Sequence, residues 1–173
     1  MRITEQMIIE EARKFMEPAG EIRTGARARS RRIPQQKIVL AETGNSYDAP
    51  AISNRRELAA FCARLNEEEA FEKFSIIAVN AQCRPIAVYS IQGSLSEVSA
   101  YPRVVATFAL LANAHSIFLT HNHPGGTCAP SAEDISSTQM LKRLLDMVGI
   151  RILDHMITTP DGNTYSLAQH GEI

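Results

Sequence analysis

The sequence lacks the usual signs of an exported, membrane-spanning or cysteine-ligated metalloprotein. Three glutamates within the first sixteen residues interrupt what would be the apolar core of a signal peptide. Residues 104–132 contain no charged side chain, but polar residues, prolines and paired glycines divide this run into pieces too short to span a bilayer. No CxxC pair occurs among the three cysteines, which are Cys62, Cys83 and Cys128. We therefore expect a reduced, cytoplasmic protein without a membrane segment.

The charge balance also excludes a strongly basic or acidic protein, because 18 Lys and Arg face 19 Asp and Glu. Residues 1–37 nevertheless hold nine basic and five acidic residues, whereas residues 38–173 hold nine and fourteen. The basic side chains of this first part include a short arginine cluster at Arg23, Arg27, Arg29, Arg31 and Arg32. This arm is either a solvated linker or a non-specific contact for DNA phosphates, because no aromatic platform or recognition helix accompanies it.

The chain divides into an N-terminal helix with the arginine-rich arm, residues 1–50, and a compact domain, residues 51–173. Apolar periodicity and turn residues predict the following elements: helices over 4–16, from an N-cap at Ser53 to Leu65, 102–114 and 131–148, and strands over 37–40, 74–79, 85–91, 117–120 and 150–158. In the helix that starts at Pro102, we expect five side chains to face inward: Val104, Val105, Phe108, Leu111 and Ala112. Helices and strands alternate without a regular repeat, which predicts a mixed α/β sheet.

The segment after the predicted 117–120 strand carries the chemistry. Residues two apart on an extended chain project to the same side, so His121 and His123 direct two imidazoles at one point while Asn122 turns away. Pro124 and two glycines let the chain turn back, so that Asp134 in the next helix returns a carboxylate to the imidazoles. Two imidazole nitrogens and one carboxylate suit zinc and leave a fourth tetrahedral position for water.

The spacing of His121-x-His123, seven residues, Ser131, two residues and Asp134 resembles the HxH-x7-S-x2-D signature of JAMM (MPN-plus) metallopeptidases. The fuller wording, HNHPGG with PSAEDI and a later Leu-Asp-His, is similar to the RadC-like branch over roughly residues 53–173. This resemblance implies a cytidine-deaminase-like α/β sandwich in which His121, His123 and Asp134 hold zinc. The N-terminal helix-hairpin-helix region of RadC proteins has no visible counterpart, and the basic arm stands in its place.

The resemblance further implies a glutamate as general base and the motif serine as the oxyanion donor. Glu72 is the best match for the glutamate because it precedes the Phe74 strand, and Glu97 is the alternative. Ser131 matches the serine, although Ser131 and Asp134 also form a helix-capping pattern. We interpret the Asp154-His155 pair as a hydrogen-bonded support for the core or the site.

These observations predict a zinc-dependent metallohydrolase that acts on peptide or isopeptide bonds of a protein substrate. A DNA-repair or mobile-element accessory protein, a nuclease included, is the alternative, with the arginine arm contacting phosphates. A catalytically silent scaffold is a third reading, and the complete ligand set argues against it.

Overall fold

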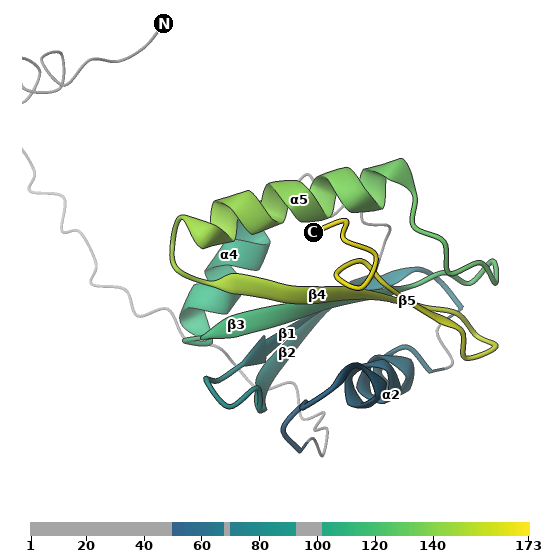
Figure 1. Ribbon diagram of the computed structural model, residues 1–173, viewed down its shortest axis with the longest axis horizontal. Coiled ribbons are helices and arrows are strands. Elements are labelled where there is room, and N and C mark those ends of the chain that lie inside the picture. The colour runs from purple at the N-terminus through teal and green to yellow at the C-terminus, as the bar shows by residue number, and fades with distance from the viewer. Residues whose placement is uncertain (1–49, 68–69, 93–101) are drawn as a thin grey trace, which may run out of the picture. The chain divides into compact units, whose positions relative to one another are not determined.

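The computed structural model describes residues 50–67, 70–92 and 102–173, and these residues fold around one five-stranded sheet (Figure 1). Its strands are β1 (Lys73–Val79), β2 (Pro85–Gln92), β3 (Ser116–Asn122), β4 (Arg151–Thr158) and β5 (Thr164–Ser166). Their order across the sheet is β2-β1-β3-β4-β5. β1 pairs antiparallel with β2 and β3, and β4 pairs antiparallel with β5. Only β3 and β4 run parallel among these pairs, so a crossover must connect them.

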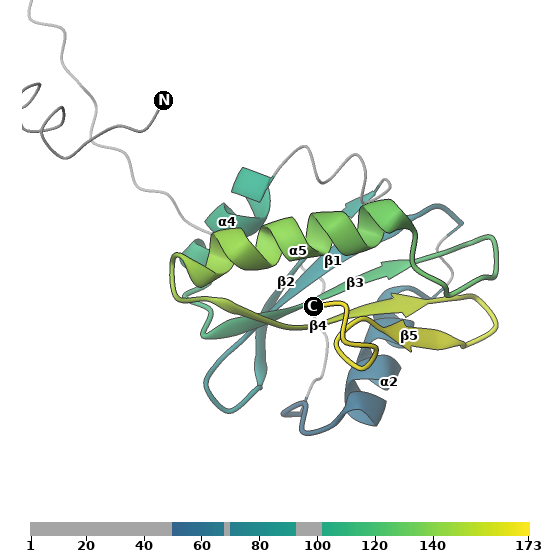
Figure 2. The same ribbon diagram turned by 45° about the horizontal axis from the view of Figure 1, so that its top comes forward.

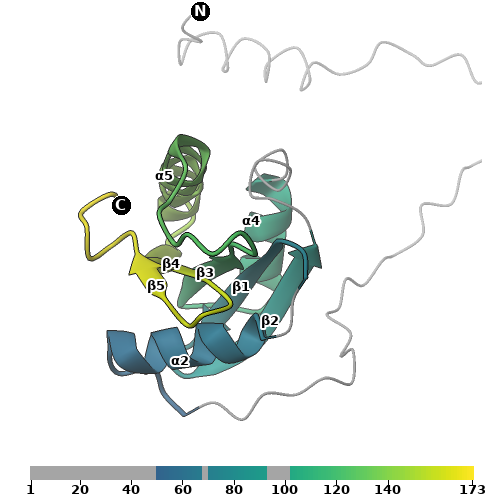
Figure 3. The same ribbon diagram turned by 90° about the vertical axis from the view of Figure 1, so that its right-hand side faces the viewer.

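Three helices cover the sheet, one on one face and two on the other (Figure 3). α2 (Arg55–Leu65) packs on the first face, and α4 (Pro102–Leu111) and α5 (Ala132–Asp146) pack on the second, where α5 is the crossover from β3 to β4. All residues of β1 and β3 are buried, as expected of central strands covered on both sides. Within the described ranges, no helix has the length and apolar content needed to cross a membrane.

The two faces alternate residue by residue along the central strands. Phe74, Ile76 and Leu119 pack under α4 and α5. Ile77 and Phe118 pack against α2 instead. Because side chains two apart in a strand share a face, His121 follows Leu119 to the α5 side.

The predicted elements of the compact domain are present with bounds that mostly differ by one or two residues, and three differences need an explanation. Asn54, not Ser53, caps α2, and its side chain accepts from the Glu57 backbone N–H. β5 was not predicted, because three residues are too few for a strand pattern. The helix predicted over 102–114 ends at Leu111.

This early end of α4 has a local cause. Asn113 adopts a left-handed φ of 52°, and the Ala114 N–H bonds the Ala109 carbonyl, which together form a Schellman-type end. Leu111, predicted to face inward, is 38% exposed, and Ala109 is buried instead. The predicted helix over 4–16, the strand over 37–40 and the arginine arm lie outside the described residues.

The loop between β3 and α5 lies at the end of the sheet where β4 turns into β5 (Figure 2). The His123 N–H donates to the Thr158 carbonyl over 2.8 Å, so the chain leaving β3 stays attached to the end of β4. This end of the sheet carries the histidine and aspartate residues described next.

Candidate metal centre

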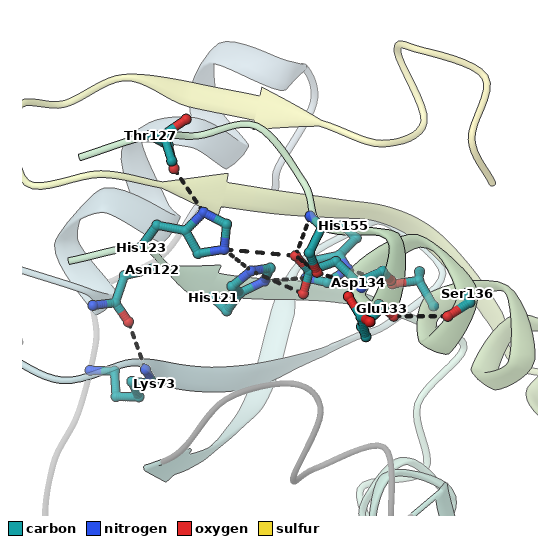
Figure 4. A network of polar contacts seen from close by, with 11 residues as sticks. Lys73, His121, Asn122, His123, Thr127, Glu133, Asp134, Ser136 and His155 are labelled. Carbon is teal, nitrogen blue, oxygen red and sulfur yellow. Dashed lines mark hydrogen bonds and ion pairs between the residues drawn. The ribbon is translucent and has the colours of Figure 1, made fainter. Parts of the chain in front are cut away.

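His121, His123 and Asp134 converge as their spacing predicts (Figure 4). The Nε2 atoms of the two histidines lie 2.8 Å apart. The Asp134 carboxylate lies opposite them, with Oδ1 3.5 Å from His121 Nε2 and Oδ2 3.7 Å from His123 Nε2. β3 and the first turn of α5 thus present two nitrogens and a carboxylate at one point.

These donors can hold a metal ion such as tetrahedral zinc. Ligand bonds of about 2.0–2.1 Å separate the ligand atoms of such an ion by about 3.4 Å, close to the 3.5 and 3.7 Å between Asp134 and the imidazoles and wider than the 2.8 Å between the two Nε2 atoms. The side-chain exposed fraction rises from 3% at His121 to 16% at His123. The group is therefore anchored on its buried side and open on the other, as a site that admits water and substrate requires.

The His123 ring is oriented for metal binding by a carbonyl. Its Nδ1 lies 2.7 Å from the Thr127 carbonyl oxygen, which can only accept, so Nδ1 carries the proton. Nε2 is therefore the nitrogen left to face His121 and Asp134. The two Nε2 atoms are close enough for a proton or a metal ion to lie between them.

Asp134 is held by Ser131 in a capping box at the start of α5. The Ser131 backbone N–H and hydroxyl both donate to Asp134 Oδ2 over 2.7 Å, and the Asp134 N–H donates to the Ser131 hydroxyl. Oδ1 is then directed at His121. The single hydroxyl hydrogen of Ser131 is donated to Asp134. Donation of this hydrogen to an oxyanion would require the hydroxyl to turn, so this role of Ser131 stays a prediction.

His121 is neutral at physiological pH. Burial lowers its pKa to about 4, the nearby Asp134 carboxylate opposes this shift, and His123 adds to it. A neutral imidazole keeps the lone pair that a metal needs.

A third histidine supports His121 from β4. His155 is fully buried, and its Nε2 lies 2.8 Å from His121 Nδ1. Burial lowers its pKa well below the usual value, and His121 and His123 add to this effect. Its Nδ1 lies 2.7 Å from the Thr138 hydroxyl of α5. The side chains of Asp154 and His155 therefore have different partners. The Asp154 carboxylate accepts from the His155 and Ala168 backbone N–H groups and from the Ser166 hydroxyl.

Asn122, between the two ligands, faces away from them as predicted. Its Oδ1 accepts from the Lys73 N–H over 2.7 Å (Figure 4). Its Nδ2 donates to the Phe71 carbonyl over 3.0 Å. The two backbone groups it holds flank Glu72. Asn122 therefore joins the metal-ligand segment to the segment that carries the predicted general base.

Glu72 lies one residue before β1, and β1 pairs with β3 so that Phe74 is opposite His121. Alternation places position 72 on the same face of β1 as Phe74, whose ring packs edge-on against His155 at 6.0 Å. This is the face that carries the metal-ligating histidines. The alternative base, Glu97, lies outside the described residues.

Sequence reasoning missed the roles of Thr138 and Asn122. Thr138 carries no motif signal, because a threonine inside a helix has no distinctive neighbours in sequence. For Asn122, strand alternation predicts only that the amide turns away from the ligands, and the backbone groups that it contacts depend on the pairing of β1 with β3.

Comparisons with known proteins agree with this geometry. A UPF0758 protein of Pseudomonas entomophila is 41% identical over 140 residues, which cover 80% of this chain and 60% of that protein. UPF0758 proteins of Cupriavidus pinatubonensis and Aromatoleum aromaticum are 40% and 42% identical over 105 and 101 residues, covering 60% and 58% of this chain and 46% and 45% of theirs. The chain thus spans about half the length of these relatives. A family model described as the RadC-like JAB domain matches residues 52–172. The chain belongs to the RadC-like JAB domain family, within the JAMM superfamily, and its His121, His123 and Asp134 form a group able to bind a metal ion.

Proposed function

We propose that this domain is a zinc-dependent hydrolase of amide bonds, acting on peptide or isopeptide bonds of a protein substrate. The observation that carries the proposal is the convergence of His121, His123 and Asp134 on one point, with a buried side and an open side. The nitrogen and carboxylate donors favour zinc over magnesium or calcium, which prefer oxygen ligands alone.

When bound, zinc would supply a water molecule whose pKa is lowered to about 7 and would polarise the substrate carbonyl. The three ligands hold the ion, and Asp134 is in turn held by the Ser131 capping box. Glu72, on the same face of the sheet, takes a proton from the attacking water and passes it to the leaving amine. Ser131 donates its hydroxyl hydrogen to the developing oxyanion after turning from Asp134.

The choice of amide bonds rests on the family, since JAMM metallopeptidases share this ligand spacing.

The first test is metal content. Purified full-length chain, saturated with zinc and freed of excess, should retain about one zinc per chain, and the His121→Ala, His123→Ala double variant should retain none. A wild-type protein that holds no metal under these conditions would overturn the proposal.

The second test is hydrolysis of fluorogenic peptides and of lysine-linked isopeptides. Glu72→Gln should keep the zinc and lose about 10²- to 10⁴-fold in rate, the usual contribution of a general base. Glu133→Gln is the matched control, because it removes the same charge from an exposed acid beside Asp134. Hydrolysis that survives loss of the ligands, or that falls equally in both glutamate variants, would contradict these assignments.

A second candidate function rests on the sequence of the arm. Five arginines within residues 23–32 offer charge for DNA phosphates. DNA binding that weakens steeply with salt, disappears when residues 21–33 are deleted and leaves hydrolysis unchanged would add this role. Hydrolysis of DNA rather than peptides by the metal site would replace the first proposal.

A further inference from the structure

We propose that Thr138 and His155 are positioning residues that fix the His121 ring in the form protonated on Nδ1, so that the Nε2 lone pair faces the metal. The inference rests on the proposed metal site and adds to it two residues that touch neither ion nor substrate. Three polar contacts in series carry it, from Asp134 through Thr138 and His155 to His121.

Thr138, in α5, determines which atom donates in each of these hydrogen bonds. The Thr138 hydroxyl lies 2.6 Å from the Asp134 backbone carbonyl, one turn earlier in the helix. A carbonyl oxygen only accepts, so Thr138 must donate its single hydrogen there. The Thr138 oxygen can then only accept from His155, and His155 Nδ1 must carry a proton.

The second step passes through His155. The ring is fully buried, and among the described residues its nitrogens bond Thr138 and His121. The neighbouring carboxylate of Asp154 bonds the His155 backbone, Ser166 and Ala168 instead of the ring. A buried cation without a carboxylate partner is costly, so the ring is neutral and its Nε2 holds a lone pair.

The third step defines the His121 ring. His155 Nε2 accepts over 2.8 Å, so His121 Nδ1 must donate its proton. The lone pair of His121 is then on Nε2, the atom that lies 2.8 Å from His123 Nε2 and 3.5 Å from Asp134 Oδ1. His123 Nδ1 is occupied more directly, by the Thr127 carbonyl. In both rings Nδ1 is thus the nitrogen bonded to the protein, and Nε2 faces the point where a metal would bind.

Loss of the Thr138 hydroxyl removes the acceptor that keeps the His155 proton on Nδ1. His155 could then carry its proton on Nε2 and donate to His121 Nδ1. This would move the His121 proton to Nε2, where it blocks the metal. Zinc would first have to displace that proton, and its affinity would fall.

The decisive pair of variants is Thr138→Val and Thr138→Ser in the full chain. Valine keeps the shape of threonine without the hydroxyl, whereas serine keeps the hydroxyl and loses a methyl group in a fully buried position. Zinc affinity is measured by competition with a fluorescent chelator. We expect the valine variant to bind about 10- to 100-fold more weakly and the serine variant to stay within about 3-fold of the wild type.

A purely structural role for Thr138 predicts the opposite order, with serine more damaging than valine, and would overturn the inference. Nitrogen-15 NMR of the chelator-treated wild type reads the His121 ring without any variant. Protonation on Nδ1 supports the inference, and protonation on Nε2 overturns it even if the valine variant does not fold.

The outcomes also separate this inference from the proposed function. One outcome is that the wild type binds zinc and the double histidine variant does not. If both Thr138 variants then bind zinc like the wild type, the proposed role of Thr138 and His155 is wrong and the metal site stands. If the wild type binds no zinc, the metal site itself fails.

Discussion

The metal-free domain should be sensitive to mild acid, because His121 and His155 are buried in their neutral form at the candidate metal site. Burial lowers the pKa of His121 to about 4 and that of His155 well below its usual value. In the unfolded chain both titrate near 6.5. Between these values the unfolded state binds more protons than the native state, so the free energy of unfolding falls as pH falls.

The expected size follows from this difference. From pH 7.5 to pH 5.5, His121 removes about 1 kcal/mol from the free energy of unfolding, since each pH unit between its native and unfolded pKa corresponds to about 1.4 kcal/mol per proton. His155 acts in the same direction, so the loss is a noticeable part of a typical stability of about 5–15 kcal/mol. The Asp134 carboxylate, which faces His121 from α5, opposes part of the His121 shift and is already included in its pKa.

The assay is urea unfolding of the chelator-treated protein at pH 7.5, 6.5 and 5.5, a range in which ordinary carboxylates stay ionised. His121→Asn removes one of the two groups and should reduce the pH dependence. A wild-type free energy of unfolding that does not change over this range would contradict the prediction, because the histidines would then be as easily protonated in the native state as in the unfolded chain.

Three further predictions concern neighbouring residues. Asn122→Ala frees the backbone on both sides of Glu72, so the hydrolysis rate should fall about 10- to 100-fold with zinc affinity nearly unchanged. The control Asn66→Ala removes two hydrogen bonds on the α2 side and should keep the rate per folded molecule; equal losses in both variants would contradict a role of Asn122 in positioning Glu72. Asp154→Ala leaves three donors without their acceptor and should destabilise the domain by about 2–4 kcal/mol in urea unfolding; a change below about 1 kcal/mol would show these bonds to be dispensable. Burial raises the pKa of the Cys62 thiol to about 12, so in a thiol-reagent assay at pH 8 it should react only after unfolding, and modification in the native state would contradict this burial.

The ligand group could be predicted because each of its parts is local. The two-residue period of an extended chain places His121 and His123 on one side, and the helix cap at Ser131 aims Asp134 back at them. Neither relation depends on which strand pairs with which. The same locality explains the small errors: Ser53 and Asn54 are both good capping residues, and only the backbone conformation at Asn54 selects between them.

The supporting residues could not be predicted, because they reach the site through strand pairing. His155 lies on the His121 side of the sheet because β4 runs parallel beside β3 and the register shifts by one residue between Ile117 and Phe118. A one-residue difference in register would turn the His155 ring to the α2 face. Glu72 similarly depends on the antiparallel register that sets Phe74 opposite His121.

The candidate ligand group could be predicted from the identities and short-range spacing of the donor side chains, since these specify their chemistry and their common direction. The residues that orient those donors follow from the choice of neighbouring strands and from their register. Short-range geometry follows from backbone periodicity alone, whereas contacts such as His121 with His155, 34 residues apart, exist only after the sheet has formed.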